Sequence, residues 1–317
     1  MTTVEHKVVM HGRAVRSGGA VPAAAGAVLT HLEYSLHGAV DMAFRRASGA
    51  GRRQAWLRTA GQADFKHGEK TGSEEMSLYF ESRPFGEVAE EYFAQPKLFA
   101  DGPQKDDTPF DVLADTVSDV LNKRTNSERY DIGLLKRFQK LRSSVFDKDV
   151  SELLISGHRI DAATPCRIEP AFASLAQELY LQTPIPARVR VAGTLDMVQA
   201  STLAFELLLP TGDRVRGVWK GEEFETLRRL ANTEIVASGM AIYRPSGTLL
   251  RVDADSLAPQ RPGDGFFATV PVPMGGKLDL KSLVREQKKR GGIAAMWGQI
   301  AAEESDEEFL AAVAEMD

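Results

Sequence analysis

An alternation of apolar and polar side chains that begins after residue 186 constrains the fold of this chain more than any other feature. In its first stretch, Val191, Leu195 and Met197 alternate with Arg190 and Asp196. This period predicts a half-buried strand with the three apolar side chains inside. Similar short β patterns follow, and a helical pattern separates the third from the fourth. These residues therefore predict one helix at 224–230 and five strands, at 188–198, 205–209, 215–219, 235–243 and 249–252.

The order of three strands, one helix and two strands resembles the OB fold, and the resemblance covers residues 187–257. Gly193 and Gly239 lie near the centres of two strands, where glycine often marks the bend or bulge that lets a small barrel close. An SH3-like or translation-factor-like barrel would show the same rhythm and stays open as an alternative. The resemblance implies a barrel core that contains Leu195, Phe205, Val215, Trp219, Val236 and Leu249.

The chain before the barrel mixes helical and β patterns. A long helix is expected from Pro22 to about Arg46, because apolar residues four apart form a stripe: Val28, Leu32, Leu36, Val40 and Phe44. Thr183-Pro184-Ile185-Pro186 ends this part, since two prolines separated by one residue exclude a helix. Further helices are expected at 109–121, 132–145 and 170–181, a turn at 68–73, and strands at 5–16, 53–60, 76–81 and 152–157.

These patterns predict an α+β protein with three parts, and its 317 residues are enough for two domains. Residues 1–183 form an N-terminal mixed α+β domain with a helical extension. Residues 184–260 form a five-stranded OB-like β-barrel. Residues 261–317 form a C-terminal appendage with a basic helix and an acidic terminal helix, because six basic residues lie between 277 and 290 and seven acidic residues follow.

The composition also bears on where the protein works. Its single cysteine, Cys166, cannot form an internal disulfide, which favours a reducing compartment. The first residues carry no basic segment followed by an apolar stretch, and no apolar run is long enough to span a bilayer. We therefore expect a cytoplasmic protein without a membrane segment. Its many alanines, arginines and glycines indicate a GC-rich bacterial genome.

Residue patterns typical of catalytic and metal sites are absent from the sequence. The stretch 68–73 lacks the ending of a phosphate-binding loop, and the six histidines lack the spacing of a metal site. We therefore expect no catalytic, cofactor-binding or metal-binding residues and no cofactor, which favours a non-catalytic protein. An enzyme whose site is assembled from distant residues stays open as an alternative.

The barrel suggests a nucleic-acid function, because OB folds often bind single strands. Between residues 185 and 257, however, nine basic residues stand against nine acidic ones, whereas a nucleic-acid footprint is basic. The aromatic residues also stand where a barrel core needs them, which we favour as their role. The candidate nucleic-acid face would combine arginines for phosphates with rings for bases: Arg188, Arg190, Arg214, Arg216, Trp219 and Tyr243.

The end of the chain carries the candidate partner-binding helix. Ser305-Asp306-Glu307-Glu308 has the form of a capping box, and apolar residues at helical spacing follow it: Phe309, Leu310, Val313 and Met316. A helix this short has only marginal stability alone in water. We therefore expect it to dock either on this chain or on another.

We therefore expect a non-catalytic binding or adaptor protein, an accessory subunit of a larger bacterial assembly. It would bind a protein partner or associate with itself. Single-stranded nucleic-acid binding is the first alternative, and an enzyme with a dispersed site is the second.

Overall fold

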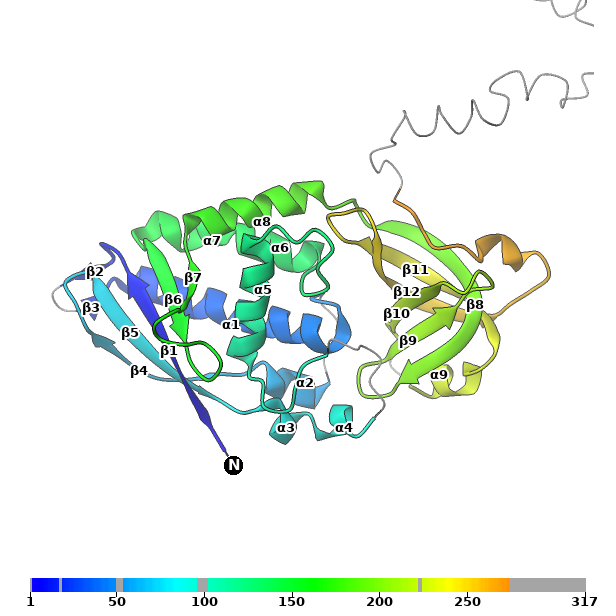
Figure 1. The fold of residues 1–317 in the computed structure, drawn as a ribbon, viewed down its shortest axis with the longest axis horizontal. Coiled ribbons are helices and arrows are strands. Elements are labelled where there is room, and N and C mark those ends of the chain that lie inside the picture. Colours follow the sequence, from blue (N-terminus) through cyan, green and yellow to red (C-terminus); the bar gives the residue numbers. More distant parts are fainter. Residues whose placement is uncertain (1, 17–18, 50–53, 96–101, 222–223, 274–317) are drawn as a thin grey trace, which may run out of the picture. The chain divides into compact units, whose positions relative to one another are not determined.

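The computed structural model describes residues 2–16, 19–49, 54–95, 102–221 and 224–273 (Figure 1). Its N-terminal part contains a five-stranded sheet made of β1 (Val4–His11), β4 (Asp64–Lys70), β5 (Glu75–Ser82), β6 (Glu152–Ser156) and β7 (Cys166–Ile168). The strand order is β4-β5-β1-β6-β7, and β1 pairs antiparallel with both of its neighbours. Val8 and Met10 of β1 are fully buried, but the strand predicted at 5–16 ends at His11, and Val15–Arg16 belong to a separate strand. A small hairpin of β2 (Val15–Arg16) and β3 (Gly19–Ala20) follows β1.

Helices share a hydrophobic core with one face of this sheet. The long predicted helix is confirmed as α1 (Pro22–Arg45), and its apolar stripe is buried. Helix α1 packs against α5 (Pro109–Leu121), and α6 (Ile132–Gln139) packs against α8 (Pro170–Gln182). Shorter helices complete this part: α2 (Ala55–Ala60), α3 (Phe85–Val88), α4 (Glu90–Phe93) and α7 (Leu141–Ser144).

Side-chain caps fix where two of the helices begin, and both helices begin at the predicted residues. The Asp111 carboxylate accepts from the backbone N–H of Thr108 (2.9 Å), and the Thr108 hydroxyl accepts from the backbone N–H of Asp111 (3.4 Å). This reciprocal capping box begins α5. The Asp131 carboxylate accepts from the backbone N–H of Leu134 (3.0 Å) and begins α6.

Two further local predictions in the first hundred residues are wrong. The described part of 53–60 forms helix α2, in which Leu57 and Ala60, three residues apart, are buried. Residues 64–70 form strand β4, so the turn expected at 68–73 begins only at Thr71. Every residue of β4 is exposed, so no alternation of buried and exposed side chains marks this strand in the sequence. The segment is a strand because its backbone pairs with β5.

The predicted barrel is present and closed (Figure 1). It consists of β8 (Ala187–Gln199), β9 (Ala204–Leu208), β10 (Arg214–Trp219), β11 (Glu234–Tyr243) and β12 (Leu249–Pro259), with α9 (Phe224–Leu230) between β10 and β11. The order around the barrel is β10-β12-β11-β8-β9. Strands β10 and β12 run parallel and the other pairs antiparallel. This closed, mixed, five-stranded barrel is consistent with an OB-like fold.

The barrel core confirms most of the predicted inward positions and corrects two. A register shift in the pairing of β8 with β9 follows Leu195, so Val198 packs against the barrel core and Met197 packs against Ala204 outside it. Val236 is buried but lies outside the barrel core, whereas its neighbours Ile235 and Ala237 belong to that core. The bulge expected at Gly239 is confirmed by a register shift. The other predicted core residues lie in or against the cluster: Leu195, Phe205, Val215, Trp219 and Leu249.

Residues 1–274 group as one compact unit. Ile242 and Leu250 of the barrel belong to the same hydrophobic core as the N-terminal helices. The domain boundary at Thr183–Pro186 stays a prediction, and the basic and acidic helices predicted after residue 274 lie outside the described residues. Among the residues described, no helix is long and apolar enough to cross a membrane.

Candidate functional site

A polar cavity of about 870 Å³ lies between α1, α5 and the loops that precede and follow α5. Ala39, Ala43 and Val112 supply apolar surface to its lining. Carboxylates and guanidinium groups supply much of the rest: Arg46, Asp107, Asp115, Asp119, Glu128, Arg129 and Arg159. It is therefore the candidate site to examine, because it joins concave shape with converging polar groups.

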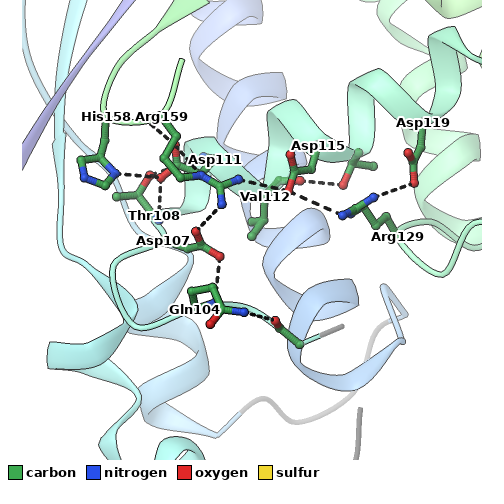
Figure 2. A network of polar contacts seen from close by, with 12 residues as sticks. Gln104, Asp107, Thr108, Asp111, Val112, Asp115, Asp119, Arg129, His158 and Arg159 are labelled. Carbon is green, nitrogen blue, oxygen red and sulfur yellow. Dashed lines mark hydrogen bonds and ion pairs between the residues drawn. The ribbon is translucent and has the colours of Figure 1, made fainter. Parts of the chain in front are cut away.

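Four aspartates run along α5 and the turn before it, four residues apart, so that neighbours lie one helical turn from each other: Asp107, Asp111, Asp115 and Asp119. Figure 2 shows two arginines that contact this aspartate row. Arg159 contacts Asp107 at 2.7 Å and Asp115 at 3.2 Å. Arg129 contacts Asp119 at 3.1 Å. The row is thus cross-linked by charge-assisted hydrogen bonds.

Asp107, Asp111 and Asp119 of the aspartate row are buried, whereas Asp115 is partly exposed. The Asp111 carboxylate, besides capping α5, accepts from the backbone N–H of Arg159 (3.2 Å). Burial raises the pKa of Asp107 above its ordinary value, although the backbone N–H of Gln104 and the charge of Arg159 oppose this. These aspartates thus serve to anchor α5 and the Arg159 loop to each other.

A second cluster lies where the loop after α5 meets the barrel, and Glu128 is at its centre. Three guanidinium groups contact this carboxylate, from Arg46 at the end of α1 (3.2 Å), Arg216 on β10 (2.8 Å) and Arg244 after β11 (2.8 Å). Burial alone would raise the pKa of Glu128, but the charges of the three arginines outweigh it and hold that pKa below its ordinary value. Glu128 therefore stays ionised and ties three elements together.

Asp131 forms a third, fully buried contact between the same two regions. Its carboxylate accepts from the backbone N–H (3.0 Å) and the hydroxyl of Ser48, and it contacts the guanidinium of Arg251 on β12 at 3.0 Å. Arg251 also donates to the carbonyl of Arg46 and contacts Asp253 at 2.6 Å. Burial would raise the pKa of Asp131, yet the Arg251 charge and the Ser48 and Leu134 hydrogen bonds lower it.

The carboxylates of the cavity contact arginines, among them Asp115, Asp119 and Glu128. The charges of the three arginines around Glu128 hold the pKa of that carboxylate low, which weakens it as a general base. Within the described ranges, no group of three or more His, Cys, Asp or Glu side chains is arranged to hold a metal ion. Burial raises the pKa of the Cys166 thiol to about 12, which disfavours the reactive thiolate.

His6 on β1 is a buried histidine beside the aspartate row. Its Nε2 lies 2.8 Å from the Ser82 hydroxyl, and its ring stacks on Phe110. Its Nδ1 is buried, and no hydrogen-bond partner for it occurs among the described residues. Burial lowers the pKa of His6 to about 4, while the charge of Asp111 opposes this shift and that of His158 adds to it.

This histidine predicts acid sensitivity in a defined pH window. The pKa of His6 is about 4 in the folded chain against roughly 6.5 when unfolded, so the unfolded state binds the proton first as pH falls. The contribution of His6 to stability is complete above about pH 6.5 and should fall by about 2 kcal/mol at pH 5. His6→Gln keeps a hydrogen-bonding amide and removes the titration. Urea unfolding at pH 7 and pH 5 should therefore show a smaller pH-dependent loss in the variant, and equal losses would contradict the assignment.

The arginines of the predicted nucleic-acid face all contact carboxylates. Arg188 pairs with Asp255 on β12 (2.8 Å) and Arg190 with Asp264 (3.4 Å). Arg214 binds Asp196 and Glu206, and Arg216 binds Glu128 and Glu206. Two of the arginines, Arg188 and Arg190, are thus on β8, and the other two are on β10. The nucleic-acid face stays a prediction.

The two aromatic residues predicted for that face lie in different surroundings. Trp219 is half-buried against the barrel core, with its indole N–H buried and without a hydrogen-bond partner in the described part of the chain. Tyr243 is buried, and its hydroxyl donates to the carbonyl of Val272 (3.2 Å). The candidate partner-binding residues Phe309, Leu310, Val313 and Met316 lie outside the described residues.

Sequence reasoning missed the cavity and its charged groups. The aspartate row did leave a signal, because four aspartates four residues apart, from just before the predicted helix to near its end, lie along one side of it. The Glu128 cluster left none, since its arginines stand far away along the chain, at positions 46, 216 and 244.

Comparisons of this chain with protein-family models, with curated proteins and with solved structures found no match.

Proposed function

We propose that this chain is a non-catalytic binding protein that acts as an adaptor, an accessory subunit of a larger bacterial assembly. A protein partner would bind at the junction of α8 and β8. We call this surface the α8–β8 corner and define it by Leu181, Ile185 and Val272. One observation carries the proposal: these three apolar side chains are 72%, 83% and 78% exposed.

The three residues of the corner belong to neighbouring segments. Leu181 is in the last turn of α8, and Ile185 precedes β8, whose first residue Ala187 pairs with Ala241 of β11. Two residues further along β11, Tyr243 holds the carbonyl of Val272. Exposed apolar side chains on neighbouring segments can form an apolar patch, and patches of this kind are typical of protein-binding surfaces.

A charge introduced at the corner should prevent partner binding without unfolding the protein. The double variant Leu181→Asp/Ile185→Asp changes only exposed side chains, so its melting temperature should stay within about 2 °C of the wild type. Tyr34→Asp, at an exposed residue of α1, is the matched control. Affinity capture from the native host followed by mass spectrometry should recover a partner with wild type and control but not with the double variant. Light scattering on the same three proteins tests self-association.

Single-stranded nucleic-acid binding is the second candidate, favoured by two phenylalanine rings and one arginine beside β8. The guanidinium of Arg190 lies 4.3 Å from the ring centre of Phe267. The adjacent Phe266 ring is 84% exposed, as a base-stacking platform requires. If the same protein binds single-stranded DNA with an affinity that falls steeply with salt, and recovers no protein partner, the adaptor proposal is wrong.

A further inference from the structure

A second cavity, of about 710 Å³, lies where two short N-terminal helices meet the barrel. Residues of α2 and α4, Gln95 after α4, and the loop that joins β8 to β9 line it. It has no described lining residue in common with the cavity beside α5. Small-molecule sites occur preferentially where two parts of a protein meet, so the groups that line this cavity decide what it can hold.

Trp56 supplies a flat aromatic surface to this second cavity. Its side chain is half-buried, and its ring meets that of Phe44 edge to face, with 5.2 Å between the ring centres. The indole N–H donates to Oε1 of Gln54 (2.5 Å). An indole fixed by such contacts loses little entropy when a planar ring stacks on it, which favours an aromatic ligand.

Two charged side chains of the second cavity are available to a ligand. Arg58 of α2 and Glu91 of α4 are exposed, and no ion pair or side-chain hydrogen bond joins either of them to another described residue. The arginines and carboxylates of the cavity beside α5, in contrast, contact one another. Arg58 can therefore offer a planar pair of N–H donors to a phosphate, and Glu91 can accept from N–H groups of a ligand.

The hydrogen bonds between the two sides of this cavity are long. The Gln54 amide donates to the carbonyl of Ala200 at 3.4 Å, whereas N–H donors in proteins prefer about 2.9–3.0 Å. Oε1 of Gln95 accepts from the N–H of Ser201 at 3.4 Å and from its hydroxyl at 3.3 Å. The amide nitrogen of Gln95 has no hydrogen-bond partner within the described ranges. These two amides can thus turn to a ligand without breaking a strong contact.

We propose that this second cavity binds a nucleoside monophosphate. The base stacks on Trp56, and the phosphate accepts from the guanidinium of Arg58. Glu91 and the amide of Gln95 hydrogen-bond the donors and acceptors along the edge of the base. A nucleotide fits this set because it combines a planar ring, a polar edge and an anionic group. The cavity shares no residue with the α8–β8 corner, so the proposal does not depend on the adaptor function.

Isothermal titration calorimetry of the purified chain with AMP, GMP, CMP and UMP tests this proposal at constant ionic strength. At least one nucleotide should bind in a saturable way. Its nucleoside and ribose 5-phosphate should each bind at least about tenfold more weakly, because each lacks one of the two contacts. Arg58→Gln should weaken binding of the nucleotide about tenfold and leave the affinity for the nucleoside unchanged, because only the phosphate contacts Arg58.

Fluorescence tests where the base lies. The chain has three tryptophans, and a base that stacks on Trp56 should quench part of their emission. Trp56→Phe keeps an aromatic ring for stacking, so it should still bind the nucleotide in the calorimeter but lose most of the quenching. Unchanged quenching in this variant would place the ligand elsewhere and overturn the proposal.

Arg229→Gln is the matched control, because Arg229 is an exposed arginine of α9 that lines neither cavity. Its affinity for the nucleotide should equal that of the wild type. The proposal is overturned if no nucleotide binds, if ribose 5-phosphate binds as tightly as the nucleotide, or if Arg58→Gln keeps the wild-type affinity. Since Arg58 is exposed, its replacement should leave the fold intact, so this comparison decides the question even where Trp56→Phe fails to fold.

Discussion

Replacing Asp131 by alanine is expected to lower the free energy of unfolding by about 4–5 kcal/mol, the sum of a broken buried ion pair and a lost helix cap. The Asp131 carboxylate caps α6, accepts from Ser48 and contacts Arg251, whose side chain is only 3% exposed. Without it, the Arg251 guanidinium loses a buried counter-charge. Urea unfolding of Asp131→Ala at pH 7 measures the loss.

Two further variants separate the contributions of Asp131. Asp131→Asn retains an oxygen for the α6 cap and removes only the charge, so it should be less damaging than alanine. In Asp131→Ala/Arg251→Met no buried guanidinium is left, while Lys220 still contacts Asp253 (3.2 Å), so at least about 2 kcal/mol should return. A loss below about 1 kcal/mol in Asp131→Ala would mean that the residue acts only as a cap.

Leu207→Asp is expected to unfold the barrel. Leu207 is fully buried in the barrel core, and an unpaired carboxylate there costs several kcal/mol out of a total stability of roughly 5–15 kcal/mol. Val191→Asp should have the same effect, since Val191 is fully buried in the same cluster. Circular dichroism and a thermal melt should show loss of the cooperative transition.

Arg190→Ala is the matched control, because it is on the same strand as Val191 with its side chain on the opposite side. Arg190 is about half exposed and contacts Asp264 at 3.4 Å, an ion pair worth about 0–1 kcal/mol. Its melting temperature should stay close to that of the wild type. Equal melting temperatures for all three variants would contradict the register of β8.

Local patterns were sufficient for those elements whose own side chains determine them. The five strands and the helix of the barrel, the α1 stripe, and the starts of α5 and α6 all follow from residue spacing and caps within a few positions. They could be predicted because the period of burial and the capping hydrogen bonds act over one or two turns of chain. The side chains predicted to point inward on β8 are correct only up to the bulge after Leu195. Beyond it, one extra residue exchanges the inward and outward positions.

The charged clusters depend on contacts between residues far apart along the chain. The sequence by itself determined an α+β chain with a closed barrel, since apolar burial follows local spacing. Strand β4, exposed on every residue, and the pairings of Glu128 and Asp131 were decided only in the tertiary structure. Glu128 and Arg216 stand 88 positions apart, and Arg251 and Arg46 stand 205 apart. Ion-pair partners leave no periodic pattern, so only the folding of the helices against the barrel brings these groups within hydrogen-bond distance.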